Sequence, residues 1–364
     1  MYVFVCAGCG RELTVPLSQV ALPIHAHQSF GNGLQLPVLM EPGTFAVDPE
    51  PSGPPYRRWE EVDPDEAAAR GIHAPVRSLS YGPAGAVAVA PGDVRGTVLT
   101  PDRRGGACCG LAGGDGPNMT CGACGLPVAT RIDDCSLWQA VWLDPAAVHR
   151  LPSDGDGPEP PSWEHLVTHS AGTPPYEPLV RWGARPGPHC QWSWSPRWAA
   201  AAGHALAHLL VASRGRPVTV PPGPAGQMFQ GALGKLLPAG PPPLRAGLAG
   251  PGLPGTDAAV LLVPVHPHTG LTWAPSRPAR LVPLPFGVWH RLAFAPPEPA
   301  HHRIGPRTRH LLADEDPPPP RPDRPLWPDW HVFRHTLVRL PAAGSPWMRE
   351  ILPELTDPAR FRFL

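Results

Sequence analysis

Residues 6–10 read Cys6-Ala-Gly-Cys9-Gly10, and residues 121–125 read Cys121-Gly-Ala-Cys124-Gly125. Two cysteines three positions apart can both face one ion, and the glycine after them adopts the positive φ that turns backbone amides towards the thiolates. Short strand-like segments precede the first unit, at Tyr2-Val-Phe-Val5, and follow the second, at Val128-Ala-Thr130. The two units therefore predict one tetrahedral zinc site with the ligands Cys6, Cys9, Cys121 and Cys124.

The two cysteine pairs are far apart in the sequence, because 111 residues separate Cys9 from Cys121. Compact zinc ribbons separate their pairs by about 12 to 20 residues. We therefore expect the intervening segment to be a long insertion between the two halves of a zinc-ribbon-like module. Four thiolates saturate zinc and leave no position for a reacting water, so the expected role of the ion is structural.

Three other cysteines leave alternatives open. Cys108 and Cys109 could combine with Cys121 and Cys124, and Cys135 could substitute for one of these ligands. Adjacent cysteines rarely bind the same ion, so at most one of Cys108 and Cys109 is expected in a given site. A redox pair would instead open a helix, which neither unit does in this sequence. The last alternative is that the cysteines are small buried hydrophobic residues.

The other titratable groups favour structural roles. These groups are His25 with His27, His204 with His208, Asp133 with Asp134, and the single Cys190. The pair at 204 and 208 has the spacing of a zinc-binding helix, but Ala205 stands where a metalloprotease has its catalytic Glu. The two aspartates are expected to form a turn or to orient nearby backbone.

The composition indicates a folded chain with many loops. Pro (57) and Gly (39) make up just over a quarter of the 364 residues, yet 42% of the residues are apolar and 13 are Trp. That apolar content is too high for a chain that leaves its side chains in water. We expect most tryptophans to pack the Pro-rich loops, and two or more exposed in one patch would indicate partner binding. The composition excludes a fibre, a membrane span and a polycationic nucleic-acid binder.

The charge distribution argues against a nucleic-acid partner, and the N-terminus and the cysteines indicate a cytoplasmic protein. The formal net charge is zero, with an excess of five acidic residues in 1–150 and of five basic residues in 151–364. Near the two cysteine units the basic residues are essentially Arg11 and Arg131, which is fewer than phosphate binding requires. The N-terminus lacks the basic region of a signal peptide, so a cytoplasmic protein with reduced cysteines is expected.

The chain is predicted to have two domains of the α+β class, β-rich and dominated by loops. The first is a zinc-ribbon-like module over 1–150, and the second is a Pro/Trp-rich α+β domain over 151–364, with the acidic Pro/Gly-rich stretch 151–161 at the boundary. The clearest helix is expected from Ser195-Pro196 to Arg214-Gly215. Strands are expected at Val218–Val220 and at Ala258–Val265, with a loop over 237–255 between them, whereas 330–340 suits a helix or a strand.

The segment Cys108-Cys-Gly-Leu, the two Cys-x-x-Cys-Gly units and Val128–Cys135 resemble a group of uncharacterised actinobacterial proteins. The resemblance covers mainly residues 1–150. That group has no known activity, so the resemblance implies no catalytic residue. The cysteine units are also similar to those of zinc ribbons, which serve nucleic-acid binding, protein interaction and purely structural roles.

The leading functional hypothesis is a zinc-stabilised cytoplasmic binding or accessory protein that acts through protein–protein contacts made by exposed Trp/Pro loops. A nucleic-acid-binding zinc-ribbon protein is a less favoured alternative, because the local charge is mixed. The other alternative is an enzyme with its site in residues 151–364. No membrane partner is expected, and the sequence assigns no catalytic residue.

Overall fold

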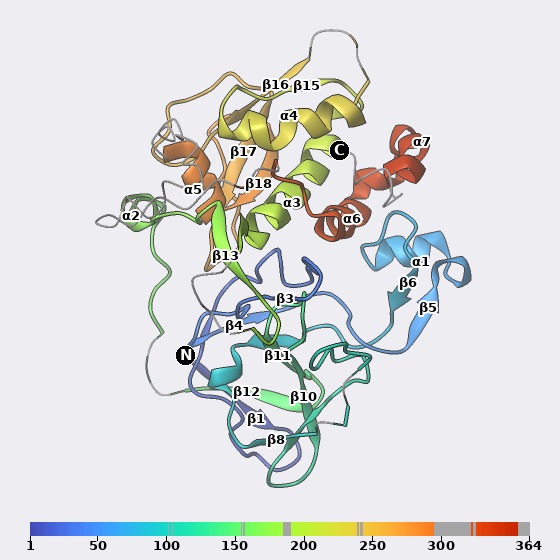
Figure 1. Ribbon diagram of the computed structural model, residues 1–364, viewed down its shortest axis with the longest axis vertical. Helices are drawn as coiled ribbons and strands as arrows, with labels where there is room; N and C mark the ends of the chain where they lie inside the picture. Colours follow the sequence, from blue (N-terminus) through green and yellow to red (C-terminus); the bar gives the residue numbers. More distant parts are fainter. Residues whose placement is uncertain are drawn as a thin grey trace.

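The computed structural model describes all residues except 101, 104, 154, 156, 185–190, 239, 241, 242, 295–321, 323, 324 and 356–364. In the described residues the chain is a mixed α+β protein with several sheets, seven α-helices and many irregular connections, which confirms the predicted class. Cys190 lies outside the described residues. Figure 1 shows a β-rich part that contains the N-terminus and, above it, a part in which helices surround a sheet.

The β-rich part contains a seven-stranded sheet in which only β2 and β4 pair in parallel. Its strands, in spatial order, are β2 (Ser18–Gln19), β4 (Thr44–Val47), β7 (Val87–Val89), β11 (Ala140–Leu143), β10 (Pro127–Ile132), β9 (Met119–Cys121) and β8 (Thr97–Leu99). Four of these strands come from the segment between the two cysteine units. The segment is therefore part of the sheet rather than an appendage to it.

A separate antiparallel ribbon brings the first cysteine unit to this sheet. It pairs β1 (Tyr2–Cys6) with β12 (Val148–Pro152), so that Cys6 lies opposite Val148. The apolar side chains of β1 and those on one face of the sheet form a shared core, in which Phe4 packs edge-on against Phe45. The alternating residues of the same strands, such as Ala46 and Ala88, face a second cluster around Trp138.

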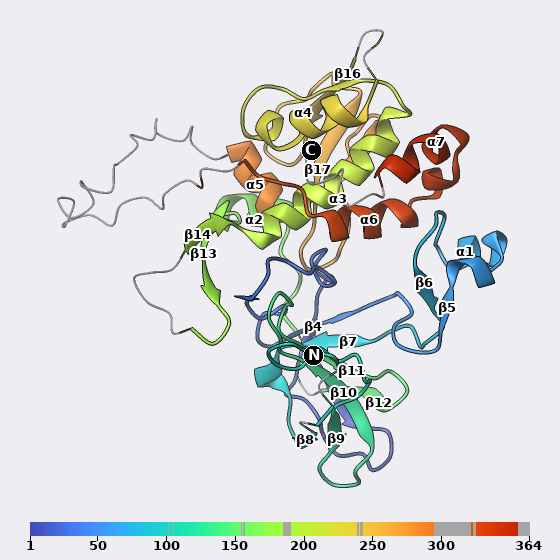
Figure 2. The same cartoon turned by 45° about the vertical axis from the view of Figure 1, so that its right-hand side comes forward.

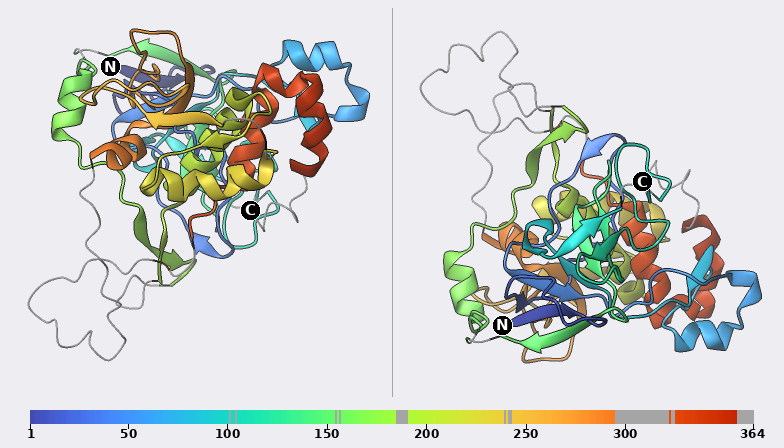
Figure 3. Two further views of the ribbon diagram at one scale, coloured as in Figure 1. Left: turned by 90° about the horizontal axis from the view of Figure 1, so that it is seen from above. Right: turned by 90° about the horizontal axis from the view of Figure 1, so that it is seen from below.

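An excursion from the β-rich part reaches the C-terminal helices. It consists of β5 (Tyr56–Arg58), the short helix α1 (Pro64–Ala69) and β6 (Ser78–Ser80), which pairs with β5. Asp63 caps α1 by accepting hydrogen bonds from the backbone N–H groups of the next turn. Figure 2 and the view from above in Figure 3 show this excursion beside the last helices of the chain. The N–H of His73 donates to the carbonyl of Val338 at this contact.

The C-terminal part contains a four-stranded parallel sheet, an arrangement that the sequence analysis did not anticipate. Its order is β15 (Val218–Thr219), β16 (Leu244–Leu248), β17 (Val260–Val265) and β18 (Arg280–Pro285). The expected strands at 218–220 and 258–265 are present, but the expectation of a loop throughout 237–255 was wrong, because β16 lies inside it. Along β17, Val260 and Leu262 face the helices, and Leu261 and Val263 face a smaller cluster with Trp273. This sheet is therefore buried on both faces.

Three helices pack around the parallel sheet: α3 (Pro196–Ser213), α4 (Pro224–Leu236) and α5 (Phe286–Phe294). Helix α3 begins and ends as predicted, with Pro196 in its first turn and Arg214 in the left-handed conformation after its end. A Cβ at Gly203 would lie 2.3 Å from the carbonyl oxygen of Asp329, so the glycine permits the close approach of the helix that begins after Asp329.

The remaining helices are α2 (Trp163–His169), α6 (Trp330–Arg339) and α7 (Pro346–Leu355). The ambiguous segment 330–340 is thus helical, and Asp329 caps α6 by accepting from the N–H of Val332. No helix within the described residues is both long enough and apolar enough to cross a membrane.

Sheet pairing and buried polar contacts join the two parts of the chain. Strand β13 (Tyr176–Arg181) pairs with β14 (Gln191–Trp194) on one side and with β3 (Leu34–Gln35) on the other. The buried amide of Gln28 donates to the carbonyl of Pro196 and to the carboxylate of Asp329, and it accepts from the indole of Trp138. These contacts therefore fix how the two parts lie against each other.

Glu50 carries a second polar contact between the parts. Its carboxylate accepts a hydrogen bond from His335 (3.1 Å) and forms an ion pair with Arg339, both on α6. Burial by itself raises the pKa of Glu50, but the hydrogen bond and the charges of His335 and Arg339 outweigh it and lower the pKa from 4.5 to about 2. Burial lowers the pKa of His335 in turn, so near neutral pH its ring acts as a neutral donor and Arg339 supplies the charge. The ionised form is thus favoured in the folded state.

Glu50→Gln should therefore lower the free energy of unfolding by about 1–2 kcal/mol near neutral pH, allowing for solvent screening. Because the folded-state pKa is depressed, this stabilisation is present above the unfolded-state pKa and is lost as the pH falls towards 2. Urea unfolding from pH 7 downwards should show the wild-type and variant curves converging below about pH 4.5. The exposed Glu159→Gln is the control, and a difference independent of pH would contradict the assignment.

Candidate metal centre

The two cysteine units form turns with the same backbone hydrogen bonds. In the first turn, the N–H of Cys6 donates to the carbonyl of Arg11 and the N–H of Gly10 donates to the carbonyl of Cys6, each at 2.8 Å. The second turn, over 121–126, repeats both bonds at the same length. The two turns therefore present their cysteines in equivalent ways, which is the arrangement expected of two halves of one binding site.

The glycines have the conformation predicted for them. Gly10 has φ +74° and Gly125 has φ +76°, and a Cβ at either position would meet no atom within 4 Å. Space is therefore available for a side chain, and the requirement for glycine comes from the backbone conformation alone.

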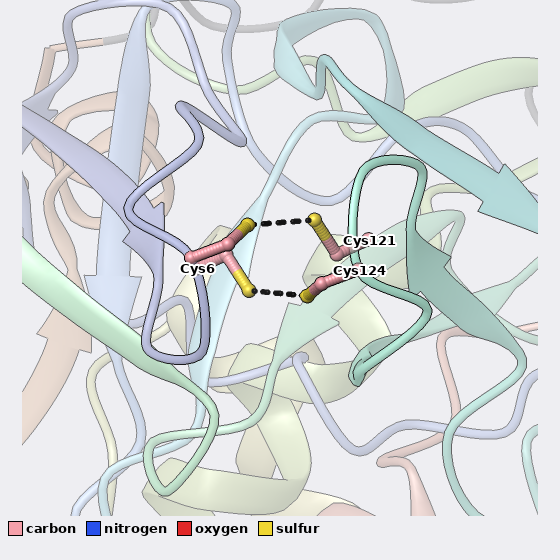
Figure 4. Close-up of side chains that lie close together, drawn as sticks. Cys6, Cys121 and Cys124 are labelled. Atoms are coloured by element: carbon pink, nitrogen blue, oxygen red, sulfur yellow. Dashed lines mark hydrogen bonds between the residues drawn. The ribbon is translucent and has the colours of Figure 1, made fainter.

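The structure brings together the four predicted ligands. The sulfurs of Cys6, Cys9, Cys121 and Cys124 all lie within 4.8 Å of one another. Figure 4 shows Cys6 from the N-terminal turn facing Cys121 and Cys124 from the opposing turn. Two contacts across the site, Cys6 to Cys124 and Cys9 to Cys121, are 3.6 Å between sulfurs. Tetrahedral coordination with metal–sulfur bonds of 2.3 Å gives a sulfur separation of about 3.8 Å, so this group can hold a metal ion with little movement.

The site lies at the margin of the β-rich core. Cys6 and Cys121 are each 1% exposed and pack among the apolar residues of that core, whereas Cys9 and Cys124 are exposed. Backbone N–H groups of Ala123 and Cys124 hydrogen-bond the sulfur of Cys121 and lower its pKa to about 6. In the same turn the backbone N–H of Leu126 lowers the pKa of Cys124, but hydrogen bonds with Cys6 and Cys9 outweigh it and raise that pKa to about 12. In this turn the thiolate, which is the form that binds metal, is thus favoured at Cys121 only.

A second group of possible ligands lies elsewhere in the same part. It contains Cys108, Cys109, Asp134 and Cys135, whose ligand atoms also lie within 4.8 Å of one another. The alternative set of Cys108 and Cys109 with Cys121 and Cys124 is therefore not the one that the structure assembles. Sequence reasoning also did not anticipate both adjacent cysteines in one group, nor the participation of Asp134.

A hollow of about 530 Å³ opens beside the first group. Its lining consists of Cys9, Gly10, Arg11, Glu12, Arg95, Gly96 and Ala123. Arg95 was missed because it is remote in sequence from both turns. Backbone hydrogen bonds of its segment place it there, from the N–H of Arg95 to the carbonyl of Leu13 (2.7 Å) and from the N–H of Gly122 to the carbonyl of Gly96 (2.8 Å). Cationic and anionic side chains share this surface.

The histidine pairs have structural contacts, as expected. His25 packs on Trp138 and His27 hydrogen-bonds Asp48 at 2.9 Å. His204 and His208 lie with their ring centroids 4.7 Å apart on α3, and burial lowers the pKa of His204 to about 3 and that of His208 to about 4. None of the four belongs to a metal-ligand group within the part of the chain that the structure describes.

Cys124→Ser should abolish metal binding at the first site and weaken the β-rich part. Fastening the ends of the 111-residue segment is comparable to closing a long disulfide loop, so its loss should cost about 3–5 kcal/mol. Limited proteolysis should then cut residues 10–120 faster and leave α3 largely protected. Ala123→Ser introduces the same hydroxyl beside the ligand and should behave as wild type. Equal protection of Cys124→Ser and wild type would mean that these cysteines are only packing residues.

Gly125→Ala tests the conformation of the turn without removing a ligand. An L-residue in the left-handed region costs about 1–2 kcal/mol, so the variant should unfold at lower denaturant and bind metal less tightly. Gly92→Ala is the matched control, because Gly92 lacks a positive φ and a Cβ there would also meet no atom within 4 Å. Equal stability of the two variants would show that the turn does not depend on this conformation.

No protein-family model, curated protein or solved structure matches this chain. The cysteine groups and their surroundings are therefore the features from which its function is inferred.

Proposed function

We propose that the chain is a zinc-stabilised accessory protein of the cytoplasm that acts through contacts with a protein partner. The observation that carries this proposal is the convergence of four sulfurs within 4.8 Å from two turns of matching geometry. All seven cysteines in the described residues are free thiols, in keeping with a reducing compartment.

Zinc is the ion proposed for the four-cysteine site. A tetrahedral set of four thiolates is typical of structural zinc, although iron also accepts it. Such a set occupies every coordination position of zinc, which leaves none for substrate or an activated water. We therefore assign the ion a role in holding the fold and no role in catalysis.

The proposed ion would act on the architecture of the whole β-rich part. It would join the turn after β1 to the turn between β9 and β10, at the two ends of the segment that supplies β2, β4, β7 and β8. These strands are only two to four residues long. Short strands bury little surface each, so a metal crosslink contributes a large share of the stability of such a module.

The surface proposed for partner contact is β8 rather than the tryptophan loops. Eleven of the thirteen tryptophans are buried or half-buried, and only Trp192 and Trp327 are exposed. In contrast, β8 is the last strand of its sheet and exposes the apolar side chains of Val98 (56%) and Leu99 (38%). An exposed apolar edge strand is suited to pairing with an extended segment of another protein.

The charges near the site favour a protein partner over a nucleic acid. Arg11 and Arg95 line the hollow beside Cys9, but Glu12 lines it too. Arg131 is paired with Asp133 at 2.9 Å. Phosphate binding relies on clustered unpaired cations, and this surface has mixed charge.

Metal analysis and affinity purification from the native host test the proposal together. Zinc should be present at one or more equivalents per chain in the wild type, with one equivalent lost in Cys124→Ser. Val98→Asp should keep all the metal and lose a protein partner that the wild type retains. Leu271→Asp is the control, because Leu271 is equally apolar and exposed (67%) but lies outside the β-rich part.

Three outcomes would contradict the proposal. Protein without zinc, or with iron in its place, would overturn the assignment of the ion. A partner retained by Val98→Asp would overturn the assignment of the surface. Recovery of nucleic acid that is released by nuclease and by moderate salt would favour the nucleic-acid alternative.

A further inference from the structure

The second cysteine group joins two segments that lie far apart in the sequence. Cys108 and Cys109 belong to the connection between β8 and β9, and Cys135 follows the end of β10. The sulfur of Cys108 lies 3.1 Å from that of Cys135 and 3.5 Å from that of Cys109. Cys135 is buried, whereas Cys108 and Cys109 are exposed, so the group opens to solvent on one side.

The carboxylate of Asp134 accepts hydrogen bonds from the backbone that carries Cys108 and Cys109. One carboxylate oxygen, Oδ1, accepts hydrogen bonds from the N–H groups of Cys109 (2.9 Å) and Gly110 (2.7 Å). The other, Oδ2, has a single long contact with the N–H of Cys108 (3.3 Å) and lies 4.0 Å from the sulfur of the same residue. One oxygen is thus fixed by the backbone, and the other is turned towards the thiols. Metal-binding carboxylates are commonly held in this way.

The same hydrogen bonds explain how two adjacent cysteines enter one group. In an extended strand their side chains would point to opposite sides. Here three successive N–H groups, from Cys108 to Gly110, converge on one carboxylate, so the chain curls around Asp134. The curl brings both sulfurs to the same side. A Cβ at Gly110 would lie 1.9 Å from the carbonyl oxygen of Asp133, so the close packing of this turn requires glycine.

We propose that Cys108, Cys109, Cys135 and Asp134 form a second metal site, which takes a thiophilic divalent ion such as zinc through three sulfurs and one oxygen. Both sulfur contacts are shorter than the tetrahedral separation of about 3.8 Å, so the exposed Cys108 must move about 0.7 Å away from Cys135 and about 0.3 Å away from Cys109 when the ion enters. The second site is independent of the four-cysteine site and goes beyond the proposed function.

The two sites lie at opposite ends of β10. The turn that carries Cys124 precedes this strand and Cys135 follows it, and a six-residue strand spans roughly 15–20 Å. They are therefore separate mononuclear sites rather than one cluster. An oxygen ligand suits a thiophilic ion less well than a fourth sulfur. The second site should thus release its ion to a chelator before the first.

Native mass spectrometry of the full chain, prepared with zinc and a reductant, tests the proposal. We expect two ions in the wild type and one in Cys109→Ser, which changes an exposed residue. Ala107→Ser, in the same loop, should keep both ions. Cys9→Ser should also keep one ion, so the two variants should each lose a different one. Chelator titration should remove the remaining ion at lower chelator concentration from Cys9→Ser than from Cys109→Ser.

Asp134→Asn provides a second test, which keeps the two short hydrogen bonds of the turn and loses only the long contact from the N–H of Cys108. An amide oxygen can replace Oδ1 as the acceptor of the two short hydrogen bonds, which places the amide nitrogen where Oδ2 would bind the ion. The variant should fold and lose one ion, and cadmium-113 NMR should show that the lost resonance is the one with mixed sulfur and oxygen ligation.

Three results would overturn the second site. In the first, the wild type binds a single ion, and this ion is lost in Cys9→Ser and kept in Cys109→Ser. That result would mean that only the four-cysteine site binds metal. Another is a Cys108–Cys135 disulfide that persists under the reducing preparation. The third is two ions that both remain in Cys109→Ser and in Asp134→Asn. A wild type without any ion would overturn the four-cysteine site as well.

Discussion

The β-rich part depends on one constraint, which is that residue 6 and residue 124 must lie close together although 117 residues separate them. Their sulfurs are 3.6 Å apart, and the two turns that carry them have the same hydrogen bonds and the same left-handed glycine. Thiols held this closely gain little from one another, whereas four thiolates around one dication gain a great deal. The arrangement is therefore one that can hold a metal ion, which is the basis of the proposed function.

The segment between the two turns does more than connect them. The residues between the turns supply strands to the central sheet and also make the contacts with the C-terminal part, through Gln28 and Glu50. The C-terminal part has a parallel sheet with its own helical cover and a large apolar core. The β-rich part instead divides its buried apolar side chains between two smaller clusters, one around Phe45 and one around Trp138.

The sequence predicted correctly those features that depend on residues close together in the chain, and also the convergence of the two cysteine units. Pro196 marks the start of α3, Gly125 takes the positive φ, and the four cysteines of the two turns converge. Prediction failed where the local structure depends on contacts between residues far apart in the chain. Strand β16 lies in a Pro/Gly-rich segment whose composition suggests a loop, and it is stabilised by its parallel neighbours. The role of Asp134 was only partly predicted, because its effect on nearby backbone is local, but its approach to Cys108 depends on how the Gly-rich loop returns to β10.

The measurement that tests the central claim most directly is a crystal structure of the zinc-loaded protein, with anomalous data collected on both sides of the zinc absorption edge. We predict an anomalous peak about 2.3 Å from each of the sulfurs of Cys6, Cys9, Cys121 and Cys124. A cavity without such a peak, or a disulfide between the two turns, would contradict the account that a metal ion closes this module.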